Sequence, residues 1–91
     1  MKYLICYDIP ETKIRTKVVK YLQEFSYRLQ YSVFLGEGSR TDIEQTKARL
    51  KNFVVDSPKS RFIILPLSAE NLQAWWLYGT ALEEKKDFLI A

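Results

Sequence analysis

The 91-residue chain has no histidine and a single cysteine, Cys6. Without histidine, neither a Ser-His-Asp nor a Cys-His nucleophilic constellation can be built, and a metal site of the Cys/His type is excluded as well. One cysteine can form no disulfide within the chain, which fits a reducing compartment. Carboxylates, basic residues and aromatic rings remain as the groups available for chemistry.

Glycine and proline are also scarce, with three residues of each type. Gly36 and Gly38 lack the spacing of a phosphate-binding glycine loop. We find no repeat, low-complexity tract or linker, so we expect residues 1–91 to form a single domain. The N-terminal apolar run, residues 3–7, is too short for a membrane span or a signal-peptide core. The sequence therefore predicts a soluble, cytoplasmic protein with no membrane partner.

Positive charge is concentrated in the first part of the chain. The formal net charge is +3 at pH 7, and residues 1–40 hold seven Lys and Arg against four Asp and Glu, whereas residues 41–91 hold seven against seven. A localised basic surface indicates an anionic partner such as nucleic acid. The signature of the common four-stranded RNA-recognition module is missing, and the six tyrosines and two tryptophans are more typical of core and interface positions.

The first half of the sequence predicts strand, helix and strand. Residues 2–9 are almost continuously apolar, and Pro10 then prevents the strand from continuing. Residues 12–25 repeat apolar side chains every three or four positions, as in an amphipathic helix. Residues 27–35 alternate with period two and predict either one strand or two short strands that meet at a bend.

A second helix is expected after Thr41 and Glu44, which fit a capping box. This helix would end near residues 56–58. Its expected buried side chains are Ile43, Leu50, Phe53 and Val54.

Three later segments have strand character. Residues 61–67 form a continuous apolar run, typical of a strand covered on both faces, and residues 75–79 and 87–91 are shorter candidates. The element order predicts an α+β sandwich with helices on one face of the sheet. A strand at residues 87–91 would need a partner strand from its own chain or from a second copy, and so small a chain would gain core by forming a homodimer.

Asp8 is the one carboxylate at the end of a predicted central strand. An ionised aspartate is costly to bury without a partner, so two interpretations stay open. Asp8 either caps the turn at residues 9–11 or serves as a ligand for Mg²⁺, which takes oxygen ligands from one or two carboxylates and water. One aspartate per chain makes a sparse site, and a two-fold axis beside the strand end would supply a second copy.

The basic residues of the first 40 positions also have two interpretations. Lys13, Lys17 and Lys20 fall on one face of the predicted helix, which is either a solvated face or a nucleic-acid-binding stripe. Arg15 and Arg28 lie close to apolar positions and would be held in place there. The planar fork of arginine suits phosphate oxygens.

Several short motifs together resemble one known family. They are Tyr7-Asp8-Ile9, Arg15-Thr16-Lys17, and the strand residues Arg28, Gln30, Ser32, Val33 and Phe34. In combination, and across the whole chain, they resemble the second CRISPR-associated adaptation protein family, the small partner of the CRISPR integrase. Ser26, where many relatives have glycine, and Leu35, in place of a frequent acid, depart from the family pattern.

The resemblance implies a ferredoxin-like β-α-β-β-α-β sandwich with an added C-terminal strand, in a two-fold homodimer. A segment of about residues 80–91 would then pair with the partner subunit. The family's catalytic and metal-binding position maps onto Asp8, contributed by both subunits, with Mg²⁺ or another divalent cation as cofactor. Residues expected around this site are Tyr7, Gln30, Ser32 and Phe34, and those expected to bind nucleic acid are Lys13, Arg15, Lys17, Lys20 and Arg28.

The resemblance also implies a role in CRISPR adaptation, the acquisition of spacers in antiviral defence. The dimer would bridge CRISPR integrase subunits and hold the double-stranded DNA spacer precursor on its basic surface. A metal-dependent endonuclease activity on DNA or single-stranded RNA is implied as well, although one carboxylate per subunit and no general base make the question of catalysis open. The alternative is a virulence-associated ribonuclease toxin of the same fold.

Overall fold

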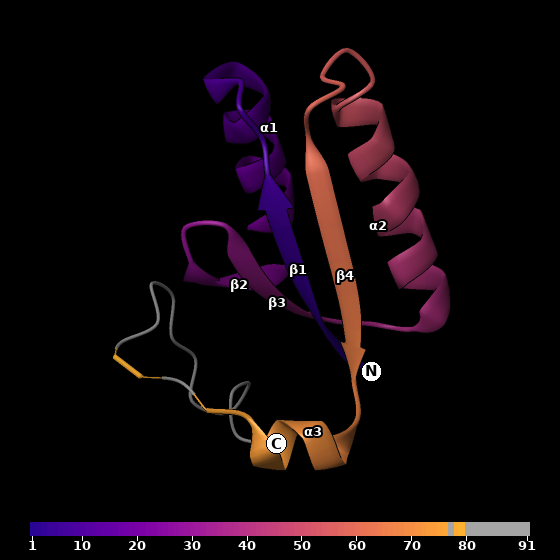
Figure 1. The fold of residues 1–91 in the computed structure, drawn as a ribbon. Coiled ribbons are helices and arrows are strands. Elements are labelled where there is room, and N and C mark those ends of the chain that lie inside the picture. Colours follow the sequence, from indigo (N-terminus) through magenta and orange to yellow (C-terminus); the bar gives the residue numbers. More distant parts are fainter. Residues whose placement is uncertain (77, 80–91) are drawn as a thin grey trace.

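The computed structural model describes residues 1–76, 78 and 79. The elements are β1 (Lys2–Asp8), α1 (Thr12–Leu22), β2 (Ser26–Gln30), β3 (Val33–Glu37), α2 (Arg40–Phe53), β4 (Arg61–Leu67) and α3 (Ala69–Ala74). The strands form one antiparallel sheet in the order β2-β3-β1-β4 (Figure 1). The predicted α+β class is therefore confirmed.

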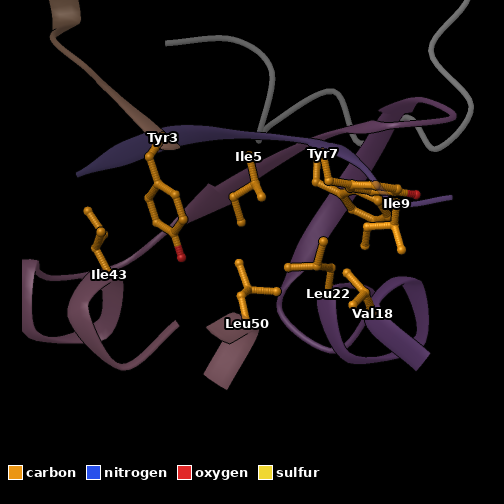
Figure 2. Close-up of a cluster of buried hydrophobic side chains, with 9 residues drawn as sticks. Tyr3, Ile5, Tyr7, Ile9, Val18, Leu22, Ile43 and Leu50 are labelled. Atoms are coloured by element: carbon orange, nitrogen blue, oxygen red, sulfur yellow. The ribbon is translucent and has the colours of Figure 1, made fainter. Parts of the chain in front are cut away.

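The main core lies between one face of the sheet and the two long helices. Alternation along β1 directs Tyr3, Ile5 and Tyr7 to this face, where each is buried. Figure 2 shows them, with Ile9, above side chains from both helices. The helix residues buried there are Val18 and Leu22 of α1 and Ile43 and Leu50 of α2. Helices on one face of the sheet were expected, and α1 and α2 confirm this.

The opposite face of the sheet, which we call the open face, carries a smaller cluster built on Leu29 and Leu35, with Trp75 packed against it. On β4, Ile63 is 65% exposed and Leu65 is 52% exposed. Within the described residues β4 lies at the sheet edge and pairs with β1 alone. Within the described residues of one subunit, the helices cover only one face of β4, so coverage of residues 61–67 on both faces stays a prediction.

Residues 27–35 form two strands rather than one. β2 ends at Gln30, β3 begins at Val33, and the chain turns at Tyr31 and Ser32 without glycine or proline. Arg28 donates from Nε and Nη2 to the Tyr31 carbonyl oxygen, at 3.1 and 2.8 Å. This side-chain contact stabilises a bend that turn-residue statistics do not predict.

The first helix is shorter than predicted. It ends at Leu22 instead of Phe25, and the buried Ser26 hydroxyl donates to the Leu22 carbonyl oxygen at 2.5 Å. Ser26, one of the two departures from the family pattern, thus adds a second donor to the Leu22 carbonyl, which also accepts from the Phe25 amide, and starts β2. Apolar periodicity alone continues to Phe25, which is half-buried against the core after the helix has ended.

The N-cap of the second helix lies two residues before the predicted one. Ser39 is the N-cap: its hydroxyl accepts from the Asp42 amide at 3.1 Å, and the Asp42 carboxylate accepts from the Ser39 amide at 2.8 Å. The Thr41–Glu44 capping box is therefore wrong. The helix ends at Phe53, a few residues before the predicted end, and a turn follows it.

The predicted strand at residues 75–79 is also wrong for the residues that can be described there. A short helix, α3, precedes them, with its own capping box between Ser68 and Asn71. Trp75, Trp76 and Tyr78 follow it outside any helix or strand. The predicted strand at residues 87–91, and the whole of residues 80–91, lie outside the described residues. Among the described helices, none is both long and apolar enough to cross a bilayer.

Candidate functional site

Asp8 is the last residue of β1 and lies directly opposite Arg61 in the ladder with β4. Its side chain is exposed, and strand alternation places it on the open face with Leu4 and Cys6. No described residue donates a hydrogen bond to its carboxylate or forms an ion pair with it. The N-cap of α1 is Glu11, so Asp8 makes no capping contact with this helix.

Two cations lie close to Asp8. Asp8 and Arg61 line a hollow together with Lys59, Pro10 and Pro58. Sequence reasoning missed Lys59 and Arg61, because their place beside Asp8 depends on the register between strands more than 50 residues apart in the chain. The hollow therefore combines one carboxylate with two groups that suit an anionic oxygen.

The β2–β3 hairpin tip packs against the end of β1. Tyr7 donates its hydroxyl to the Tyr31 carbonyl oxygen at 2.7 Å, and its amide donates to the Ser32 carbonyl oxygen at 3.1 Å. The Arg28 guanidinium lies over the rings of Tyr31 and Phe34, 5.4 and 5.6 Å from their centroids. The structure thus brings Tyr7, Ser32, Phe34 and Arg28 together beside the strand end that carries Asp8.

Gln30 is placed differently from the other residues expected around the site. It ends β2, is exposed, and pairs with Val33 after a register shift that begins at Arg28. Its place is at the outer strand of the sheet. Its role near Asp8 stays a prediction.

The loop between β1 and α1 is held from two sides. Arg15 donates from Nη1 to the Ile9 carbonyl oxygen at 2.8 Å and from Nη2 to the Thr12 hydroxyl at 3.1 Å. The buried Ser57 hydroxyl donates to the Glu11 carboxylate, which ties this loop to the turn before β4. Arg15 is therefore held in place, as predicted, by a main-chain carbonyl next to Asp8.

The predicted basic residues lie along the outer side of α1. Lys13, Lys17 and Lys20 are all exposed. Lys20 lines one hollow with Arg15 and Arg28 and a second hollow with Lys17 and an arginine of α2, Arg49. The second hollow also contains the rings of Tyr21 and Phe53. Arg49 lies in residues 41–91, where equal numbers of basic and acidic residues gave no indication of a basic surface.

A divalent cation held within one subunit would need several ligating side chains. Nowhere in residues 1–76, 78 and 79 do three His, Cys, Asp or Glu side chains gather as a metal would require. One exposed carboxylate and two neighbouring cations do not make a complete Mg²⁺ site in a single subunit. A Mg²⁺ site at Asp8 would need further oxygen ligands from outside this subunit, and the metal-binding role of Asp8 stays a prediction.

The thiol of Cys6 is a poor candidate for this chemistry. Burial raises the pKa of its thiol, so the reactive thiolate is disfavoured at neutral pH. The thiol instead contributes a small apolar group to the open face.

The chain matches one known protein family over most of its length. The sequence model of the family described as "CRISPR associated protein Cas2" matches residues 1–74. The chain belongs to the Cas2 family. The resemblance inferred from the sequence motifs is thereby confirmed.

Several Cas2 relatives extend this result. The "CRISPR-associated endoribonuclease Cas2 2" of Synechocystis is 33% identical and covers 97% of this chain and 96% of its own length. The "CRISPR-associated endoribonuclease Cas2 3" of the same organism is 31% identical and covers 85% of this chain and 83% of its own length. A Methanospirillum hungatei relative, "CRISPR-associated endoribonuclease Cas2 1", is 45% identical, but the match spans about half of each chain, 53% of this one and 52% of the relative.

Solved structures share the Cas2 fold of this chain. A hypothetical protein from Thermus thermophilus superposes with a TM-score of 0.74 at 25% identity, over 91% of this chain and 96% of that one. Streptococcus pyogenes Cas2 superposes with a TM-score of 0.72 at 21% identity, over 87% of this chain and 100% of that one. The second likeness supports the fold alone.

Proposed function

We propose that this chain is a dimeric, nucleic-acid-binding scaffold in CRISPR spacer acquisition. The observation that carries the proposal is the open face of the sheet. Ile63 and Leu65 expose most of their surface there, beside Leu4 and Cys6. A chain this small buries a limited fraction of its surface, so covering these side chains would add to its stability. Exposed apolar patches of this kind mark interaction surfaces.

The fold supports a symmetric partner for this face. The element order β-α-β-β-α-β and the strand order β2-β3-β1-β4 are those of a ferredoxin-like sandwich, and we assign the chain to that fold. A two-fold axis over the open face would place a second copy against Ile63 and Leu65. Within the described residues the outer edge of β4 pairs with no other strand, which leaves an edge for a strand from about residues 80–91 of the partner.

The basic side of α1 gives this dimer a surface for nucleic acid. The three exposed lysines and the two anchored arginines would contact backbone phosphates without reading base sequence. Two copies would extend this surface across the dimer, as a duplex spacer precursor requires. The partner proposed at its ends is the CRISPR integrase.

Light scattering and duplex binding test the scaffold function together. We expect a dimer mass, and an affinity for duplex DNA that falls linearly with salt on logarithmic axes. A monomer at every concentration with no affinity for duplex DNA or single-stranded RNA contradicts the proposal. The family match favours this role over the ribonuclease toxin, whose distinguishing mark would be an adjacent antitoxin gene instead of an integrase gene.

Metal-dependent endonuclease activity is the second candidate function. It is supported by the carboxylate of Asp8, which no described residue neutralises, and by the word endoribonuclease in the names of the Synechocystis relatives. Asp8 and Asp8 of the partner subunit would hold the cation, and Lys59 and Arg61 would bind the phosphate that faces them. A bound Mg²⁺ supplies Lewis-acid polarisation of a phosphoryl oxygen.

A further inference from the structure

We infer that Arg49 is a phosphate-binding residue, and that the hollow between α1 and α2 extends the nucleic-acid surface beyond the residues of α1. The inference rests on the proposed function, since it names a new contact for the same class of ligand. Three observations support it: the aromatic rings that contact the Arg49 guanidinium, the N–H donors that no described residue accepts from, and the charged side chains that line the hollow.

Two aromatic rings hold the Arg49 guanidinium. Its central carbon lies 5.2 Å from the centroid of the Phe53 ring and 5.8 Å from that of Tyr21. The two rings contact each other, with centroids 5.5 Å apart, and both are half-buried against the core. Stacking on such rings fixes the plane of an arginine without using its N–H groups as donors to an acceptor.

No described residue accepts a hydrogen bond from the Arg49 side chain. In the described part of the chain it donates to no carbonyl or carboxylate and forms no ion pair. The two arginines chosen from the sequence differ: Arg28 donates twice to the Tyr31 carbonyl oxygen, and Arg15 donates to Ile9 and Thr12. An arginine has five N–H donors in a fixed fork, and in residues 1–76, 78 and 79 no acceptor occupies those of Arg49.

The neighbouring charges make the hollow a site for an anion. Lys17 and Lys20 line it with Arg49, against one acid, Glu24. Lys20 also lines the hollow that contains Arg15 and Arg28, so the two basic hollows adjoin at a shared lysine. A nucleic-acid backbone, which repeats its charge at short intervals, suits such a surface better than an isolated anion does.

The experiment measures the affinity for a short duplex DNA between about 50 and 200 mM salt, with wild-type chain and matched variants. Arg49→Gln removes the charge in the hollow, and Lys51→Gln removes one charge from the same helix outside it. We expect Arg49→Gln to lower the affinity several-fold at low salt and to reduce the salt slope by about 0.9. Lys51→Gln should keep both wild-type values, and thermal unfolding should show both variants folded.

A further pair of variants tests sign and geometry. Glu24→Gln removes the one negative charge of the hollow and should raise the affinity for duplex at low salt. Arg49→Lys keeps the charge but loses the stacked fork, so the salt slope should return to the wild-type value while the affinity returns only in part.

The outcomes separate this inference from the proposed function. If wild-type chain binds duplex and Arg49→Gln behaves as Lys51→Gln does, the inference is wrong and the proposed function stands. If wild-type chain binds neither duplex DNA nor single-stranded RNA, both are wrong. If Arg49→Gln weakens binding to polyglutamate but leaves duplex binding unchanged, the hollow recognises an acidic protein, and the assignment to nucleic acid is overturned.

Discussion

The hydroxyl group of Tyr7 donates a 2.7 Å hydrogen bond to the main-chain carbonyl oxygen of Tyr31. Arg28 donates to the same oxygen from Nε and Nη2, so three donors converge on one carbonyl at the hairpin tip. Tyr7 immediately precedes Asp8 in β1. The position of the candidate metal ligand is therefore coupled to the conformation of a two-residue turn that lies about 24 residues later in the chain.

Replacing Tyr7 with phenylalanine tests this coupling. The ring and its contact with Phe34 remain, and one hydrogen bond is lost, so Tyr7→Phe should lower the free energy of unfolding by about 0.5–1.5 kcal/mol. Urea denaturation measures the change. The matched control is Tyr31→Phe, because the Tyr31 side chain is 76% exposed and should lose less than about 0.5 kcal/mol. Equal losses in the two variants would show that the carbonyl contact is unimportant.

The N-cap of α2 provides a second paired test. Ser39→Ala removes the hydroxyl that accepts from the Asp42 amide and should lower the free energy of unfolding by about 0.5–2 kcal/mol. Thr41→Ala, in the same first turn, should change it by about 0.5 kcal/mol or less, since alanine is a good helix former and no capping contact is lost. Thermal or urea unfolding of both variants decides which residue caps the helix.

Asp42 makes stability depend on acid pH. Hydrogen bonds from the backbone and the side chain of Ser39 lower the pKa of its carboxyl group. The unfolded chain therefore binds a proton at this site more readily, so the stabilisation is present above the ordinary aspartate pKa of about 3.9 and is lost as pH falls through the folded value. We expect Asp42→Asn to be less stable than wild type near neutral pH, with a gap that narrows below about pH 4. A gap that stays constant in acid contradicts this linkage.

Local pattern was enough for β1 and for the start of α1, but not for the end of α1 or the start of α2. Ser39 and Thr41 are both hydroxyl residues that precede a helical pattern. Each has an acidic residue three positions later, Asp42 and Glu44. The extended backbone at Ser39, with φ −76° and ψ 171°, decides the matter, and this follows from the path of the chain out of β3. Boundaries of this kind depend on tertiary packing, which a sequence pattern does not contain.

The candidate site shows the same division between local and long-range information. Asp8, Arg15 and Arg28 could be selected from the sequence because each has a recognisable local position. Arg61 beside Asp8 depends on the β1–β4 register, and Arg49 beside Lys20 depends on how two helices pack. The residues that sequence reasoning missed are those whose neighbours come from the other half of the chain.

Substitutions on the open face should separate dimer formation from folding. Ile63→Lys with Leu65→Lys places two charges on side chains that are already exposed in one subunit, so the isolated subunit should remain folded while the dimer dissociates. Light scattering should give a monomer mass, and far-ultraviolet circular dichroism should be unchanged. The control is Val55→Lys, because Val55 is 77% exposed and lies in the turn after α2, outside the strands. A double variant that is still a dimer would show that a different face forms the interface.

We expect Mg²⁺-dependent cleavage to require the carboxylate of Asp8. Asp8→Asn keeps the shape of the side chain and removes its charge. In the dimer the proposed site would lose both of its carboxylates, one from each subunit. If both copies hold the cation, Mg²⁺-dependent cleavage of single-stranded RNA or duplex DNA should fall about 100-fold or more, since loss of an outer-shell partner alone costs about 10–100-fold. Cleavage assays with and without chelator measure this, and duplex affinity should be unchanged or slightly higher.

Glu37→Gln is the matched control for Asp8→Asn, because Glu37 is an exposed acid at the end of a neighbouring strand, β3, and pairs with the opposite end of β1 at Lys2. It should keep the wild-type cleavage rate. Chelator should reduce wild-type chain to the residual rate of Asp8→Asn, because both treatments remove the same cation from the same carboxylates. Cleavage that survives both the chelator and the substitution would locate any nuclease chemistry elsewhere, whereas the scaffold function needs only the dimer and its basic surface and would be unaffected.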